Sequence, residues 1–169
     1  MKYDNIIAID PDREKSGVAY LQTATRKLEA SSIDFPRLLD YLQFAKKKAD
    51  DSGESLIVVV EASWMVQKSN YHPYQGHRAE KISKDVGANQ ETGKKICEMA
   101  RYYGLETLEH HPLAKCWSGP DRKITQKELS AITGIQGRMN QDARDAALLA
   151  WSYAGFPMRL NIKDLFGNS

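Results

Sequence analysis

The stretch Asn5-Ile6-Ile7-Ala8-Ile9-Asp10-Pro11-Asp12 holds four consecutive apolar residues followed at once by an acid. Such a run predicts a short buried strand. Pro11 has no backbone N–H to donate, so it ends the strand directly after Asp10. Asp10 is therefore predicted at the carboxyl end of a strand, the edge of an α/β sheet where ligands usually bind. On this stretch alone, a simple turn residue is an equally good interpretation of Asp10.

A second apolar run also ends on an acid. The residues 56–60, Leu-Ile-Val-Val-Val, are followed by Glu61. A β-branched run this apolar predicts a central strand of a mixed sheet, buried on both faces. If the two strands are neighbours, Asp10 and Glu61 lie side by side. Two adjacent carboxylates repel each other, which raises a pKa unless a cation lies between them.

The third acidic position is the pair Asp142 and Asp145, at the start of the helix-forming stretch Gln141–Trp151. Their i, i+3 spacing places both side chains on one side of a helical turn. Apolar residues continue that side, so Asp145 is predicted to point toward the sheet. A carboxylate directed at a core needs a charged partner or a metal. The alternative is that these acids simply suit the positive end of the helix dipole.

Four carboxylates in such positions favour a hard cation, Mg²⁺ or Mn²⁺. Two such ions can activate a water and stabilise the leaving oxygen in phosphodiester hydrolysis. His72 and His77 have no cysteine or acid at zinc-like spacing, so no metal site is expected from them. The sequence offers no competing serine or cysteine nucleophile and no Walker-type glycine loop.

The remaining pattern is that of an α/β chain. Strands are predicted at 18–21, 26–33 and 105–110, helices at 35–48, 79–103 and 125–133, a helical turn at 113–117, and a C-terminal tail at 156–169. Thr125 and Glu128 form a capping box. The run Lys46-Lys47-Lys48 is interpreted as a solvated helix end rather than a DNA-binding patch. Gly87 and Gly93 indicate either the close approach of another backbone or a break near Gly87.

Aromatic and basic residues alternate in the segment 62–78, which lacks clear periodicity. Trp64, Lys68 and Arg78 have the side chains that stack on bases and contact phosphates in nucleic-acid-binding segments. The alternative is a surface loop with some aromatic residues packed on the core. For Trp64, the two interpretations are equally open.

Length and composition predict one globular domain over residues 1–169. Charged residues make up 27% and hydrophobic residues 41%, and the formal net charge is only +2. Any nucleic-acid-binding surface must therefore be local. Two distant cysteines predict neither a disulfide framework nor structural zinc, and favour the reducing cytoplasm. Neither a signal peptide nor a membrane span is expected.

The motifs resemble those of the RuvC-type Holliday-junction resolvases of the RNase H-like superfamily. They are Ile9-Asp10-Pro11 with Gly17, then Val60-Glu61, then Asp142-Ala143-Arg144-Asp145-Ala146, in the family's order over nearly the whole chain. The stretch 86–89, Val-Gly-Ala-Asn, is similar to the family's glycine-containing central helix. The chain departs from the family at Asp12, where glycine is common, and at Arg144, where a small residue is usual.

The resemblance implies an RNase H-like α/β fold, with a mixed five-stranded sheet flanked by helices. It implies that two Mg²⁺ ions, with Mn²⁺ as the alternative, are ligated by Asp10, Glu61, Asp142 and Asp145. It also implies a homodimer that binds a four-way DNA junction and cuts two strands symmetrically.

The resemblance also implies roles for side chains that contact DNA. Trp64 falls where the family often has an aromatic residue that stacks at the junction centre. Lys115 and Lys123 are expected to contact phosphates. Arg144 either contacts a phosphate or pairs with a neighbouring acid.

We therefore expect a Mg²⁺-dependent, structure-selective DNA endonuclease that resolves four-way junctions. Alternatives are a nuclease for RNA–DNA hybrids or branched phage DNA, and a non-catalytic nucleic-acid-binding module. The presence of all four acids argues against the last. An actin-like phosphotransferase shares the strand–acid opening but needs glycine-rich phosphate loops, which this sequence lacks.

Overall fold

The computed structural model describes residues 2–66 and 76–160. Its elements are, in chain order, β1 (Asn5–Asp10), β2 (Lys15–Gln22), β3 (Lys27–Asp34), α1 (Phe35–Ser52), β4 (Leu56–Glu61), the 3₁₀ turn η1 (Ser63–Met65), α2 (His77–Tyr102), β5 (Glu106–His110), the 3₁₀ turn η2 (Pro120–Arg122), α3 (Gln126–Thr133) and α4 (Gln141–Tyr153). Most of the tail predicted after residue 155 lies outside the described residues.

The five strands form one mixed sheet in the order β3-β2-β1-β4-β5. β1 pairs antiparallel with β2 and parallel with β4, and β5 extends the parallel half. The predicted mixed five-stranded sheet is confirmed. The two apolar runs that end on acids are its central pair, as their composition requires.

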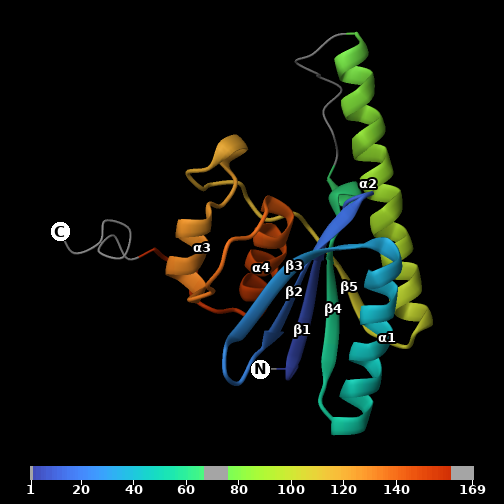
Figure 1. Cartoon of the computed structure of the whole chain (residues 1–169), viewed down its shortest axis with the longest axis vertical. Helices are drawn as coiled ribbons and strands as arrows, with labels where there is room; N and C mark the ends of the chain where they lie inside the picture. Colours follow the sequence, from blue (N-terminus) through green and yellow to red (C-terminus); the bar gives the residue numbers. More distant parts are fainter. Residues whose placement is uncertain (1, 67–75, 161–169) are drawn as a thin grey trace, which may run out of the picture.

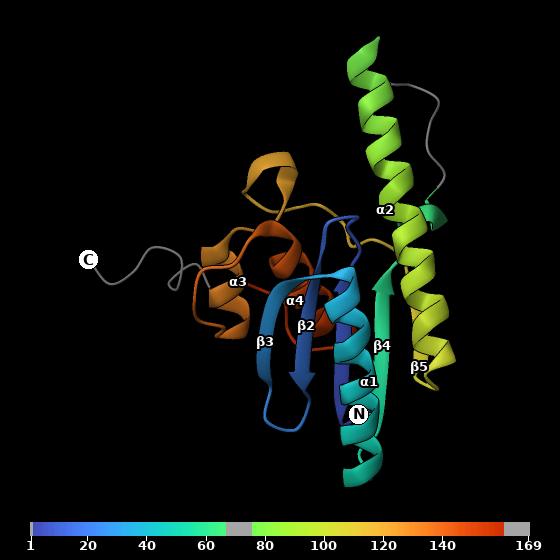
Figure 2. The same ribbon diagram turned by 45° about the vertical axis from the view of Figure 1, so that its right-hand side comes forward.

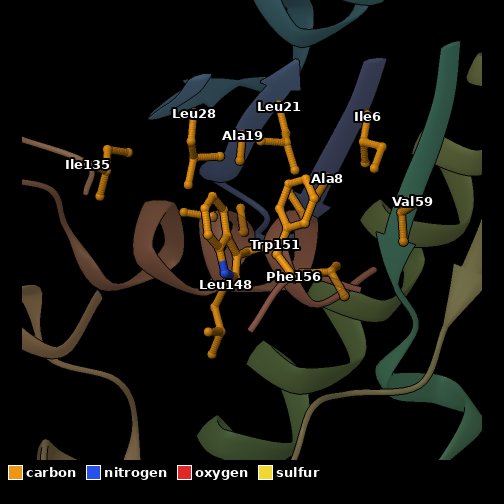
Figure 3. Close-up of a cluster of buried hydrophobic side chains, with 14 of the residues drawn as sticks. Ile6, Ala8, Ala19, Leu21, Leu28, Val59, Ile135, Leu148, Trp151 and Phe156 are labelled. Carbon is orange, nitrogen blue, oxygen red and sulfur yellow. The ribbon is translucent and has the colours of Figure 1, made fainter. Parts of the chain in front are cut away.

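Helices cover both faces of the sheet (Figure 1). Side chains alternate along β1, so Ile6 and Ala8 face α4 while Ile7 and Ile9 face α1 and α2. Figure 3 shows the core on the α4 side, where Trp151 and Phe156 lie beneath the sheet. The centroids of their rings are 4.8 Å apart. The sheet is thereby fixed from both sides, which holds the ends of β1 and β4 in place.

Two helix predictions were wrong. α1 does not end at the Lys46–Lys48 run but continues to Ser52, and Gly53 ends it in the left-handed conformation with φ +71°. The lysines belong to the last turns, where Lys47 pairs with Asp51 at 2.8 Å across one turn. The segment 113–117 forms no helical turn. Pro112 enters it in an extended connection, and regular structure resumes only at η2.

α2 is one continuous helix, so the break considered near Gly87 is absent. A Cβ on Gly87 would meet nothing within 4 Å. At Gly93 the close neighbours are side chains rather than a backbone, because Trp64 and Pro11 lie against the helix there. The N-terminal half of α2 extends beyond the sheet, as Figure 2 shows.

Cys97 is buried, Cys116 is exposed, and both are free thiols. This agrees with the expected lack of a disulfide framework. None of the helices within the described residues is long and apolar enough to cross a membrane.

Candidate active site

Asp10 and Glu61 end neighbouring parallel strands. Ile9 is in register with Val60, so the next residue of each strand reaches the same edge of the sheet. The prediction that these two acids lie side by side is consistent with this register. Both side chains line one pocket at that edge.

Gly17 lets the helix acids approach the strand acids. It is the register partner of Asp10 on β2. A Cβ on Gly17 would lie 1.9 Å from the carbonyl oxygen of Asp142, so only glycine permits this contact between β2 and the first turn of α4. Asn140 caps that turn, since its Oδ1 accepts from the backbone N–H of Ala143 at 3.0 Å.

The four carboxylates interact electrostatically. Burial raises the pKa of Asp10 well above its usual range, and the negative charges of Glu61, Asp145 and Asp142 raise it further. Burial and the charge of Asp145 also raise the pKa of Glu61. Burial, followed by the charges of Asp12 and Asp145, raises the pKa of Asp142. Each of the four predicted acids therefore interacts electrostatically with at least one of the others.

Lys123 supplies a positive charge to this group. Its ammonium lies 3.2 Å from Oδ2 of Asp145, and both side chains are largely shielded from solvent, at 33% and 17% exposure. The other oxygen of Asp145, Oδ1, accepts from Nε2 of Gln141 at 2.8 Å. Both oxygens of Asp145 therefore have partners within the protein.

A pocket of about 110 Å³ opens beside the acids. Its polar lining is Asp10, Glu61, Asp145, Lys115 and Lys123, joined by the indole of Trp117. The Nε1–H of Trp117 is buried and has no hydrogen-bond partner among the described residues. The pocket thus combines acids, ammonium groups and one unpaired donor, a set that suits a phosphate with an associated cation.

The donor set fits a hard divalent cation, because every candidate ligand is a carboxylate oxygen. In residues 2–66 and 76–160, however, no three acidic, histidine or cysteine side chains are gathered closely enough to enclose a metal. One of these acids, Asp145, is paired with the ammonium of Lys123.

The other predicted DNA-contacting residues lie in different surroundings. Lys115 is exposed on the pocket wall, and its charge opposes the rise in the pKa of Glu61. Arg78 lies at the exposed start of α2. Lys68 falls outside the described residues. Trp64 is half-buried and donates from Nε1 to Oε2 of Glu109 at 3.4 Å.

Arg144 is engaged within the protein. Its guanidinium donates to the carbonyl oxygens of Ile124 and Met139 at 3.2 and 2.6 Å, and to Oε1 of Gln141 at 2.7 Å. These bonds fasten the loop before α4 to the helix. A phosphate contact by Arg144 would have to replace them, so we leave it out of the proposed DNA interface.

Sequence reasoning missed three residues of the site. His110 is the register partner of Glu61, and its charge opposes the rise in the pKa of Glu61. Its position at the end of a predicted strand was an available signal. Gln141 stands four residues before Asp145, a spacing that also signals contact on a helix. Trp117 carries no such signal, because its segment has no periodic pattern.

Comparisons with known proteins give matches only among solved structures. No protein-family model matches the sequence, and no curated protein matches it. The chain is similar to T. thermophilus RuvC in complex with Holliday junction substrate, with 14% identity, a TM-score of 0.47, and coverage of 89% of this chain and 92% of that one. A second T. thermophilus RuvC structure gives 14% identity and a TM-score of 0.44, with 90% and 97% coverage.

The large terminase nuclease from the thermophilic phage G20c is also similar, with 14% identity, a TM-score of 0.33, and coverage of 89% of this chain and 82% of that one. The strand order and strand directions of the sheet agree with the expected fold class. The sheet is thus the mixed five-stranded sheet, flanked by helices, that was expected for an RNase H-like fold.

Proposed function

We propose that this protein is a divalent-metal-dependent, structure-selective DNA endonuclease that resolves four-way junctions. The observation that carries the proposal is the convergence of Asp10 and Glu61, from two adjacent parallel strands, with two acids from the first turns of α4. A buried group of like charges is unfavourable unless cations compensate it. In a site that cleaves phosphodiesters, bound divalent cations compensate these negative charges and take part in the reaction.

In this proposal Asp10, Glu61, Asp142 and Asp145 hold two Mg²⁺ or Mn²⁺ ions. Bound divalent ions supply activation of the attacking water and charge stabilisation at the leaving oxygen. The carboxylates would hold the ions at the edge of the sheet where β1 and β4 end. Lys123 and Lys115, which line the same pocket, would each offer an ammonium to a phosphate oxygen.

The proposed substrate contacts outside the pocket are Lys68 and Arg78. Lys68 follows β4 in the chain, and Arg78 lies in the first turn of α2. The chain carries one group of four acids, so paired symmetric cuts require two copies of it. A homodimer acting on a four-way junction satisfies that requirement. We infer a cytoplasmic protein from the two free thiols.

Cleavage of a labelled synthetic four-way junction tests the proposal. The junction is incubated with Mg²⁺ and with EDTA, alongside a linear duplex and an RNA–DNA hybrid. Paired symmetric nicks on the junction alone, lost in EDTA, are the expected result. Asp10→Asn should abolish cutting and keep junction binding, whereas Glu14→Gln, at an exposed acid of the loop that follows β1, should cut normally.

Each other outcome contradicts a different part of the proposal. Cutting of the hybrid alone would move the function to RNA removal, and cutting of branched but not four-way DNA would change the substrate. Binding of the junction without cutting of any substrate would favour a non-catalytic binding module. Activity retained by Asp10→Asn would refute its assigned role.

A further inference from the structure

We propose that Trp64 is a positioning residue, whose indole packs together with Pro11 against Gly93 and so fixes the two strand ends that carry the central acids. A Cβ on Gly93 would lie 2.5 Å from Cζ3 and 3.0 Å from Cη2 of the Trp64 indole, and 3.0 Å from Cγ of Pro11. The indole and the proline ring therefore meet on the bare backbone of α2. We call these three residues the Trp64 brace.

The brace connects both strand ends to one rigid helix. Pro11 directly follows Asp10, and Trp64 lies in η1 shortly after Glu61. The backbone between Glu61 and Trp64 is itself tied down, because the N–H of Ala62 donates to the carbonyl oxygen of His110 at 2.8 Å. A shift of the indole would thus move the ends of both β1 and β4.

The far side of the indole is fixed to β5 and α2. Nε1 of Trp64 donates to Oε2 of Glu109 at 3.4 Å. Oε1 of Glu109 accepts from both terminal nitrogens of Arg101, at 3.2 and 3.1 Å. A stacking residue for DNA would need an exposed face, whereas this indole is half-buried and contacts protein on two sides.

The brace explains why glycine occupies the interior of α2 at position 93. Glycine in a helix interior costs about 1 kcal/mol relative to alanine. At Gly87 a Cβ would have no neighbour within 4 Å, so contact with the rest of the chain gives no reason for glycine there. At Gly93 the indole occupies that space. Ligands from two strands must keep their relative positions, and misplacement by about 1 Å can cost a hundredfold in rate.

The test combines Gly93→Ala, Trp64→Phe and the double variant with Gly87→Ala as the matched control on the same helix. Three quantities are measured for each variant: Mn²⁺ affinity by calorimetry, kcat and KM on the four-way junction, and amide hydrogen exchange at Asp12 and Met65. The expected effects on Mn²⁺ affinity and on cleavage rest on the proposed function. The expected effect on amide exchange does not, so the brace can still be tested if the proposed function is wrong.

Gly93→Ala should weaken Mn²⁺ binding and lower kcat by roughly 10–100-fold with KM nearly unchanged, and should speed exchange at Asp12 and Met65. Trp64→Phe replaces the indole by a shorter ring that lacks the distal atoms Cζ3 and Cη2 and the Nε1–H that donates to Glu109. It should restore much of the loss in the double variant, because space for the added methyl group is then available. Gly87→Ala should match the wild type in all three measurements.

Several results would overturn the brace. One is a Gly93→Ala protein that unfolds more easily but binds Mn²⁺ and turns over like the wild type, because the contact would then be packing only. Another is a Trp64→Phe protein that loses junction affinity alone, which would assign Trp64 to stacking. If the wild-type protein binds Mn²⁺ but cuts no substrate, the nuclease proposal fails, and the brace is still tested by Mn²⁺ affinity and amide exchange. If the wild-type protein binds no Mn²⁺, the brace is tested by amide exchange alone. Unchanged amide exchange in Gly93→Ala would then refute the brace.

Discussion

The ammonium of Lys123 lies 3.2 Å from Oδ2 of Asp145 and provides the acidic group with a cation from the protein itself. Lys123 directly follows η2, on the connection that also forms the pocket wall. This ion pair joins the connection before α3 to the first turns of α4. This relationship makes the loop between β5 and α3 part of the site.

Replacing Lys123 by methionine should lower the free energy of unfolding of the metal-free protein at pH 7 by roughly 1–2 kcal/mol. That is less than the loss for a fully buried pair, because Lys123 is one-third exposed. Urea unfolding in EDTA measures the difference in unfolding free energy between the variant and the wild type, and added Mg²⁺ should reduce this difference. Lys127→Met, at an exposed lysine of α3, is the control and should be close to neutral. Equal losses in both variants would contradict the assigned role of Lys123.

The stability contributed by Asp10 should depend on pH. Its pKa is raised in the folded protein by burial and by Glu61, so the folded chain holds the proton more tightly than the unfolded chain. That contribution is complete below the ordinary carboxyl pKa of about 4 and is lost as the pH rises through the higher pKa of the folded state. Asp10→Asn has no such loss.

Unfolding of Asp10→Asn and wild type in EDTA, from pH 4 to pH 8, should therefore show the variant gaining relative stability as the pH rises. The expected gain is on the order of 1 kcal/mol or more. Asp40→Asn, at an exposed acid of α1, should show no comparable trend. A stability difference between Asp10→Asn and wild type that stays constant with pH would show that Asp10 is not held in an unfavourable charged state.

Gly17→Ala should be strongly destabilising. The added methyl group would lie 1.9 Å from the carbonyl oxygen of Asp142, and neither β2 nor α4 can move without disturbing the core. Overpacking of this kind typically costs about 1–3 kcal/mol or more. Chemical unfolding measures the loss, with Gly87→Ala as the open-space control. A neutral Gly17→Ala would mean that α4 is not seated on β2 as described.

Glu128→Ala should destabilise the connection that carries Lys123. Oε1 of Glu128 accepts from the N–H of Ser118 at 3.0 Å, and Oε2 accepts from the N–H and hydroxyl of Thr125, both at 2.9 Å. Losing these bonds should cost about 1–3 kcal/mol in unfolding free energy. Junction cleavage per folded molecule should also fall. Glu128→Gln keeps one amide oxygen as an acceptor and should lose less. Equal losses in Glu128→Gln and Glu128→Ala would contradict this prediction, because the one acceptor kept by glutamine would then contribute no stability.

The sheet and its acids were predictable because their signals are local and repeated. Apolar runs that end on Asp10 and Glu61 define the central strands, and the i, i+3 spacing places Asp142 and Asp145 on one helix face. The capping box of Thr125 and Glu128 was also found correctly, with both of its reciprocal bonds. Each of these features depends on residues that are close together in the sequence.

Most of the features that were missed depend on contacts between distant segments. The end of α1 is an exception, because the Lys46–Lys48 run continues into the helix through local i, i+4 pairs such as Lys47 with Asp51. Gly93 and Gly17 both permit close contacts, with Trp64 and with the backbone of Asp142, and no sequence window contains both partners. The pairing of Lys123 with Asp145 likewise joins a connection without periodicity to a distant helix.

The parallel pairing of β1 with β4 also has a consequence for synthesis of the chain on the ribosome. β1 and β4 meet only after α1 has crossed between them, and the helix acids belong to α4, the last described element to emerge. A nascent chain released before α4 therefore carries two of the four acids and no closed core on that face of the sheet. Such a truncated product lacks Asp142 and Asp145, so the proposed metal site is complete only once the last described helix has been synthesised.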